Sequence, residues 1–157
     1  MFSKSKKSIN FSRIYDGARF KYLIVASKFN EDLVNHLLTS CKQTLLNNYA
    51  KEKDIHVVRC PGAGEIPFSI NRGIHRIKPD VVIALAVIVK GETPHYDIIS
   101  YSVSHALQKI AIELDRPVIN GIITTYNINQ AKQRVLANKL NKGHEFALSA
   151  IETAGIY

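Results

Sequence analysis

The chain has 157 residues, 46% of them apolar, which is ordinary for a single soluble domain with a real hydrophobic core. No apolar run reaches the roughly 18 residues of a membrane span, and the lysines of MFSKSKKSIN precede no apolar signal stretch, so we expect a cytoplasmic protein without membrane contact. The formal net charge is +8, but residues 1–21 carry +5 of it, and no aromatic-interleaved basic stripe or zinc-finger spacing accompanies the charge. We therefore expect a solvated basic arm rather than a surface that binds nucleic acid.

The first half of the chain alternates between strand and helix patterns. Residues 20–27 predict a strand with a central apolar run, and residues 31–49 predict a helix because their apolar residues recur every three or four positions. Residues 55–60 predict a second strand, which the turn residues PGAG bring to an end. Residues 65–77 then predict a second helix.

The second half of the chain continues this alternation and ends in two helices. Residues 81–89, VVIALAVIV, predict a third strand, and helical spacing follows from about residue 94 to residue 114. Residues 117–123 predict a fourth strand. Helices are expected at residues 127–138, where Asn127 and Gln130 form a plausible capping pair, and at residues 141–154.

The order of these elements predicts the fold class. Strands that alternate with helices imply right-handed crossovers and a parallel sheet that is covered on both faces. The apolar third strand fits a central position in such a sheet. We therefore predict one α/β domain over residues 1–157, a flavodoxin-like three-layer αβα sandwich with a four-stranded parallel sheet, in which residues 1–18 form an N-terminal arm or strand.

The unusual residues of the chain gather where the predicted strands end. The strands are followed or closed by SKFN with Phe29, by PGAGE at residues 61–65, by KGETPH, and by Thr124 and Thr125. In open parallel sheets, ligands bind beyond the carboxyl ends of the strands. This edge is therefore the predicted site, although every α/β protein also places ordinary turns there.

The stretch KGETPHYD, residues 90–97, reads as a strand-to-helix junction with a phosphate site. Gly91 permits a sharp turn or a close approach of the backbone, Thr93 suits the N-cap, and Pro94 suits the first helical position. The free amides of the first turn would attract an anion, most naturally a phosphate, although many helix starts bind nothing. His95 in this turn is either a group that exchanges a proton with a ligand or an ordinary surface histidine.

The remaining candidate residues each have an alternative interpretation. The small residues of PGAGE would let a planar ligand approach the backbone, and Phe29 either stacks on such a ligand or fills the core beneath a loop. Arg134 is a phosphate partner or a solvated helix charge. Cys41 and Cys60 lack metal-ligand spacing, and we expect free buried thiols rather than a disulfide. The other five histidines form no cluster, so we predict no metal site.

The segments PGAGEIP, ALAVIVKGETPHYD, NGIITT, QAKQR and NKG occur together, and with them the chain resembles the 6,7-dimethyl-8-ribityllumazine synthase family over about residues 21–151. KGETPHYD is the most specific of them. The resemblance implies a transferase of riboflavin biosynthesis that joins 5-amino-6-(D-ribitylamino)uracil to 3,4-dihydroxy-2-butanone 4-phosphate. Such an enzyme forms an imine, eliminates phosphate and closes the ring, releasing phosphate and water, without a metal or an organic cofactor.

The same resemblance implies roles for individual residues. His95 would be the catalytic proton shuttle, and Phe29 would stack on the pyrimidine ring. The other substrate-binding residues would be Ala63, Gly64 and Glu65 at the ribityl chain, Val87, Ile88 and Val89 at the pyrimidine, Glu92, Thr93 and Arg134 at the phosphate, and Asn120 and Lys142 closing the site. Gly64 and Asn120 depart from the family pattern, which usually has larger or aromatic residues there.

The resemblance also implies an assembly. The family forms pentamers, which in some members stack twelvefold into a hollow shell, and riboflavin synthase is a candidate partner. Asn120, Arg134 and Lys142 would then come from the neighbouring subunit. Two alternatives to this enzyme are a non-catalytic flavin- or lumazine-binding protein on the same scaffold and a basic nucleic-acid-binding protein. The presence of both His95 and Arg134 favours the enzyme over the binder.

Overall fold

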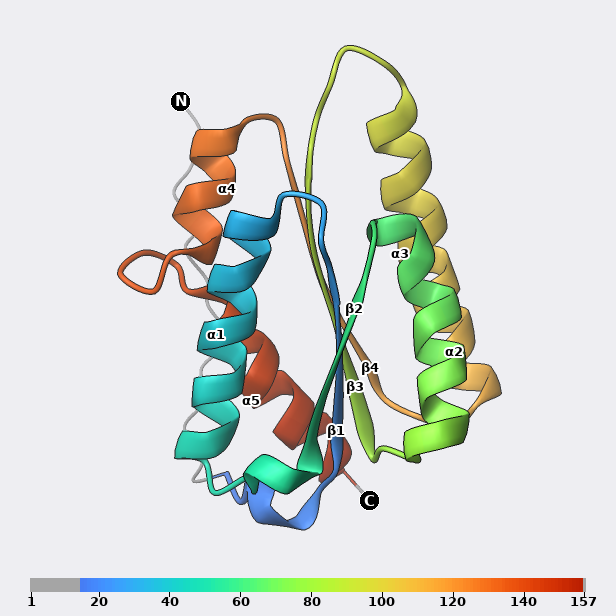
Figure 1. The fold of residues 1–157 in the computed structure, drawn as a ribbon, viewed down its shortest axis with the longest axis vertical. Helices are drawn as coiled ribbons and strands as arrows, with labels where there is room; N and C mark the ends of the chain where they lie inside the picture. The colour runs from blue at the N-terminus through green and yellow to red at the C-terminus, as the bar shows by residue number, and fades with distance from the viewer. Residues whose placement is uncertain (1–14, 157) are drawn as a thin grey trace.

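The computed structural model describes residues 15–156, which form a three-layer αβα sandwich (Figure 1). Its strands are β1 (Tyr22–Ser27), β2 (Ile55–Cys60), β3 (Val81–Val89) and β4 (Val118–Thr125). They pair in parallel in the order β2-β1-β3-β4. The helices are α1 (Glu31–Asn47), α2 (Ile66–Ile77), α3 (His95–Glu113), α4 (Ile128–Val135) and α5 (Lys142–Ala154). The predicted fold class is confirmed.

The two faces of the sheet are covered by different helices. Figure 1 shows α2 and α3 on one face, with α1, α4 and α5 on the other. Alternate residues of β1 serve the two layers, because successive side chains of a strand point to opposite faces. Leu23 and Val25 are buried in the core beneath α2 and α3, whereas Ile24 and Ala26 are buried in the core beneath α1, α4 and α5. Helices therefore cover both faces of the inner strands β1 and β3.

Most predicted boundaries lie within two residues of the observed ones, and α4 differs most. It ends at Val135 rather than near residue 138, because Leu136 adopts an extended backbone with φ −69° and ψ 137°. The predicted cap at its start is confirmed, since Asn127 Oδ1 accepts a hydrogen bond from Gln130 N at 2.9 Å. The fourth strand continues two residues beyond the prediction, because its pairing with β3 extends to Val89 and Thr125.

Only the end of the predicted N-terminal arm or strand, residues 15–18, is described. Residues Gly17–Arg19 form a short 3₁₀ helix, and Asp16 caps it by accepting a hydrogen bond from Ala18 N at 3.0 Å. The rest of the predicted arm, residues 1–14, lies outside the described residues.

Close backbone contacts hold the helices against their neighbours. A Cβ on Gly143, in the first turn of α5, would lie 2.5 Å from the backbone oxygen of Leu37 in α1. A Cβ on Gly73 in α2 would meet Leu23 Cδ2 at the same distance. Gly143 has to be glycine because the backbone of α1, in the same layer, occupies the space of a side chain, whereas Gly73 packs against the end of a leucine side chain from the sheet.

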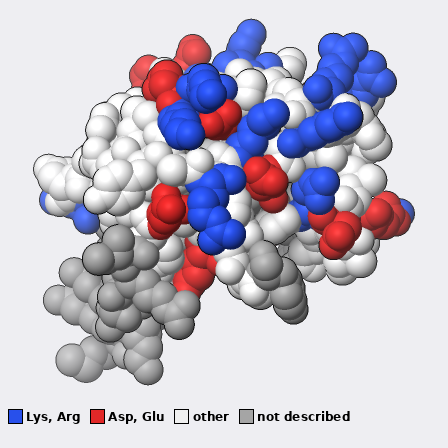
Figure 2. Space-filling model, turned by 90° about the horizontal axis from the view of Figure 1, so that it is seen from below, with Lys and Arg blue, Asp and Glu red and all other residues white. Residues whose placement is uncertain are grey.

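The surface carries both signs of charge on the face that Figure 2 shows, with basic side chains interspersed among acidic ones. Cys41 and Cys60 are free and buried, as predicted. Burial raises the pKa of the Cys41 thiol to about 12. Within residues 15–156, no helix is long and apolar enough to cross a membrane.

Candidate active site

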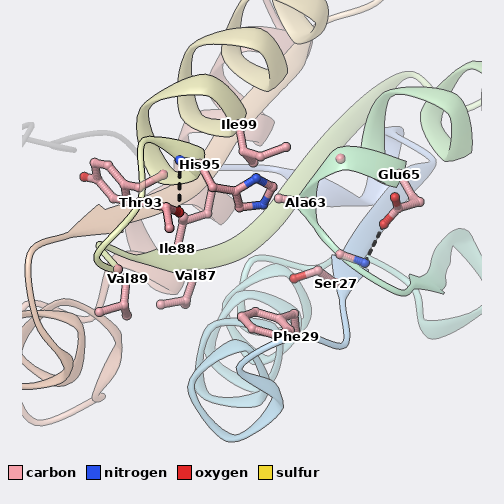
Figure 3. A pocket seen from close by; sticks show the side chains of 14 residues that line it. Ser27, Phe29, Ala63, Glu65, Val87, Ile88, Val89, Thr93, His95 and Ile99 are labelled. Atoms are coloured by element: carbon pink, nitrogen blue, oxygen red, sulfur yellow. Dashed lines mark hydrogen bonds between the residues drawn. The ribbon is translucent and has the colours of Figure 1, made fainter.

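A cavity of about 390 Å³ opens at the carboxyl edge of the sheet. Its walls come from the ends of β1, β2 and β3 and from the first turns of the elements that follow them (Figure 3). Nine of the thirteen predicted site residues line it: Phe29, Ala63, Gly64, Glu65, Val87, Ile88, Val89, Thr93 and His95. The fold therefore gathers residues that are up to 66 positions apart in the sequence.

The end of β3 gives this cavity an open strand edge. Pairing between β1 and β3 stops at Ala26 and Leu85, whereas pairing between β3 and β4 continues to Val89. Within the described part of the chain, residues 87–89 consequently have no strand partner on the β1 side, where Val87 O accepts a hydrogen bond from Asn30 Nδ2 at 2.8 Å. Such an edge offers main-chain donors and acceptors to a flat polar ligand.

The imidazole of His95 points into the cavity, toward Ala63 (Figure 3). His95 is the first residue of α3 and is exposed. Among residues 15–156, no protein group is hydrogen-bonded to its imidazole; only its backbone N–H is engaged, with Thr93 Oγ1 at 3.4 Å. The ring nitrogens are therefore available to exchange a proton with a bound molecule.

The helix behind this histidine begins one residue later than predicted. Pro94, expected at the first helical position, occupies the N-cap, although the Thr93 hydroxyl still accepts the His95 amide hydrogen bond. Gly91 does not have a positive φ, and an added Cβ would meet nothing within 4 Å. The turn therefore does not require a glycine at this position. The remaining reason for a glycine is that the open space above its backbone lets a ligand approach closely.

Phe29 belongs to the cavity and not to the core. Its side chain is 71% exposed, so the interpretation as a core residue beneath a loop is wrong. The loop that carries it is tied to the end of β2, because Phe29 N donates to Pro61 O at 2.9 Å. Figure 3 shows the ring beside Ser27 and below Val87.

The opposite wall is the short 3₁₀ helix Ala63–Glu65. Glu65 turns its carboxylate back onto its own loop, where Oε2 accepts a hydrogen bond from Gly62 N at 2.8 Å. Gly64 leaves space in the wall, since an added Cβ would meet only Ile99 Cδ1, at 3.8 Å. The buried Cys60 lies directly before this wall, and burial raises the pKa of its thiol. That thiol is therefore protonated and is a poor nucleophile at neutral pH.

Four predicted residues lie outside the cavity lining. Glu92 is exposed in the loop before α3, and Asn120 on β4 donates to Ser104 Oγ at 3.2 Å. Arg134 of α4 donates from Nη1 to Gln130 O at 3.1 Å, and Lys142 of α5 pairs with a glutamate. Helices α4 and α5 cover the face of the sheet opposite α3. One subunit alone therefore does not bring Arg134 and Lys142 to His95.

Sequence reasoning missed several lining residues, among them Ser27, Tyr96 and Ile99. Ile99 had a usable signal, because it follows His95 by four positions and thus shares its helix face. Within the described part of the chain, no group of three or more His, Cys, Asp or Glu side chains is placed to hold a metal ion.

Fold and site together define an α/β protein with a cavity suited to a small ligand at the carboxyl edge of a parallel sheet, lined by a histidine at the start of a helix. The family model described as 6,7-dimethyl-8-ribityllumazine synthase matches residues 19–157. The chain belongs to this family, whose members are transferases of riboflavin biosynthesis.

Individual relatives agree with the family match over nearly their whole length. The 6,7-dimethyl-8-ribityllumazine synthase of Aquifex aeolicus is 39% identical over 90% of this chain and 91% of its own. The relative of the same name from Leuconostoc mesenteroides is 35% identical over 93% and 94% of the two chains. The one from Clostridium kluyveri is 36% identical over 92% and 96%.

Proposed function

We propose that this protein condenses 5-amino-6-(D-ribitylamino)uracil with 3,4-dihydroxy-2-butanone 4-phosphate to give 6,7-dimethyl-8-ribityllumazine. The observation that carries the proposal is the cavity that holds His95, the open helix start beside Gly91, and the ring of Phe29 together. These are the three groups that a proton transfer, a phosphate and a planar pyrimidine require.

The pyrimidine lies between the Phe29 ring and the open edge of β3. An aromatic ring on one side and the strand edge at residues 87–89 on the other, where Asn30 engages only Val87 O, suit a flat heterocycle with donors and acceptors on its rim. Its ribityl chain runs along Ala63, Gly64 and Glu65. Because Gly62 already engages the Glu65 carboxylate, the hydroxyls meet an acceptor whose orientation is held.

The phosphate lies at the start of α3, over Gly91 and beside Thr93 and Glu92, where the first-turn amides favour an anion. The 5-amino group attacks the ketone carbon, and loss of water forms the imine. His95 then removes a proton from the adjacent carbon, and phosphate leaves from the next carbon along. Loss of phosphate leaves an enol, which takes up a proton at its terminal carbon and becomes a ketone, so the proton removed by His95 is returned there. Attack of the ribitylamino nitrogen on this carbonyl, with loss of a second water, closes the ring.

The site is completed by a neighbouring subunit in a homopentamer. Asn120, Arg134 and Lys142 of the neighbour supply the missing polar groups, with Arg134 as the charged partner of the phosphate. The exposed face of α3 supports assembly, because Ile98, Tyr101 and Ile112 are 62%, 77% and 81% exposed. Light scattering separates a pentamer from a larger shell, and a stable monomer at working concentration would exclude both.

The direct test is incubation with both substrates in a metal-free buffer, following lumazine fluorescence and phosphate release together. Equal rates of both signals are expected. Tight binding of the product without turnover would instead support a non-catalytic lumazine- or flavin-binding protein. The cytoplasmic location stays a prediction, which cell fractionation checks.

A mixing experiment tests whether one site uses residues from two neighbouring subunits. His95→Ala and Arg134→Ala subunits are unfolded, mixed in equal amounts and refolded. In a ring with head-to-tail contacts, roughly a quarter of the junctions then pair an intact His95 with an intact Arg134. Activity should recover to about a quarter of the wild-type value, and an activity equal to the mean of the two variants would show that both residues serve one subunit's site.

A further inference from the structure

The orientation of the Phe29 ring depends on the backbone of its loop. The side chain is 71% exposed and belongs to neither core cluster of the described residues. A ring without core contacts is not held in place by packing. Its position is therefore only as well defined as residues 27–31, which lead from β1 into α1.

Arg59 of β2 bridges the two ends of this loop. Its Nη2 donates to the backbone oxygen of Ser27, the last residue of β1, at 3.1 Å. Its Nη1 donates to Asn35 Oδ1 in α1 at 2.8 Å, and Nη2 lies 3.5 Å from Glu31 Oε1 at the start of the same helix. One planar guanidinium thus fixes where β1 stops relative to where α1 starts, with Phe29 between the two points.

The guanidinium is not placed for greatest stability. The Arg59 side chain is only 24% exposed, and its Nε is buried without a hydrogen-bond partner among residues 15–156. A buried donor left unpaired works against folding, so it offsets part of what the three Nη contacts contribute.

Two other ties hold the same loop. Lys28 N and Phe29 N donate to the backbone of residues 60 and 61, and Asn30 Nδ2 donates to Val87 O. These contacts set the height of the loop above the sheet. Asn30 is the N-cap of α1, whereas Arg59 is bonded to Asn35 inside the helix and so sets how far the loop leans toward that helix or toward the cavity.

We propose that Arg59 is a positioning residue that holds the Phe29 loop in the conformation that receives the pyrimidine substrate. The inference rests on the proposed function, because it takes Phe29 as the stacking partner of that substrate. It predicts an effect on pyrimidine binding and none on the phosphate site, which α3 forms on another part of the cavity wall.

The test compares Arg59→Met with Lys42→Met. Methionine keeps the apolar stem and removes the charged end. Lys42 is a matched control, since it also joins α1 to another element by an ion pair, with Glu52 at 2.6 Å. Arg59→Met should raise the KM for the pyrimidine and the Kd for 6,7-dimethyl-8-ribityllumazine about threefold, within the roughly two- to tenfold range of one aromatic contact. The KM for butanone phosphate should stay unchanged, and Lys42→Met should change neither.

Arg59→Lys separates geometry from charge. Lysine keeps the positive charge and lacks the planar fork that reaches both Ser27 O and Asn35. It should therefore bind lumazine as weakly as Arg59→Met. Wild-type binding by Arg59→Lys would assign the effect to charge and overturn the proposal.

A double-mutant cycle with Phe29→Ala tests whether Arg59 affects binding through Phe29. If Arg59 acts through Phe29, then Arg59→Met adds nothing to the lumazine Kd of Phe29→Ala. If Phe29→Ala weakens binding and Arg59→Met has no effect or an additive one, positioning by Arg59 is overturned while the proposed function stands. If Phe29→Ala itself leaves lumazine binding unchanged, the pyrimidine subsite is wrong and the role of Arg59 fails with it.

Discussion

Replacing His95 by alanine removes the one histidine among the described residues that line the cavity, without disturbing the packing around it. The imidazole is exposed and no protein group is hydrogen-bonded to it in the described structure, so the free energy of unfolding should change by no more than about 0.5 kcal/mol. Loss of a general acid–base usually slows a reaction about 10²–10⁴-fold. An amine and a ketone held together already react readily, so we expect a loss near or below the lower limit, about 10–10²-fold in kcat.

The assay follows lumazine formation at saturating concentrations of both substrates, so that kcat is separated from binding. His105→Ala is the matched control, because His105 is exposed on the same helix and lies outside the cavity. The control should keep the wild-type kcat, and both variants should unfold at the wild-type urea midpoint. A wild-type kcat for His95→Ala would remove this residue from the mechanism.

Three further changes test other parts of the structure. Arg134→Ala should raise the KM for butanone phosphate by more than the KM for the pyrimidine, because a charge-assisted contact to phosphate is lost; equal effects on both would exclude it as the phosphate partner. Gly91→Ala should fold normally, since its Cβ meets nothing within 4 Å and φ is not positive, but should bind butanone phosphate less tightly in steady-state assays; an unchanged KM would mean that no ligand approaches this backbone. Burial raises the pKa of the Cys41 thiol from 9.0 to about 12. Above pH 9 the unfolded chain therefore releases a proton that the native state keeps. This group alone then lowers the free energy of unfolding by up to about 1.4 kcal/mol per pH unit. Urea unfolding from pH 8 to 10.5 should therefore show a shallower decline for Cys41→Ala than for the wild type, and parallel declines would contradict this.

The sequence predicted the fold well because the signals that define it are local. The unbroken apolar run of β3 marks a strand covered on both faces, and the structure places it between β1 and β4. The position of residues such as Phe29 and His95 followed from chain order alone, since the carboxyl ends of parallel strands share one edge.

The part that was not predicted depends on which strands are neighbours. Arg59 looks like an ordinary charge in a strand, and it reaches Ser27 only because β2 pairs with β1 and places it opposite Ala26. The helix start at His95 was misplaced by one residue, because Thr93 and Pro94 satisfy local preferences for either of two adjacent starts. Arg134 and Lys142 raise a different difficulty, because one chain does not bring them to the cavity and their proposed role depends on the proposed assembly.

The empty space beside Gly64 makes the cavity adjustable. A side chain added at Gly64 would lie beside Ile99, at ordinary contact distance from its Cδ1, and would take up volume that a ligand otherwise uses. A graded series from alanine through valine to phenylalanine would shrink the chamber stepwise while leaving the scaffold intact. Substitutions at Gly64 alone should therefore change which ribityl analogues the cavity accepts, according to the bulk of each analogue.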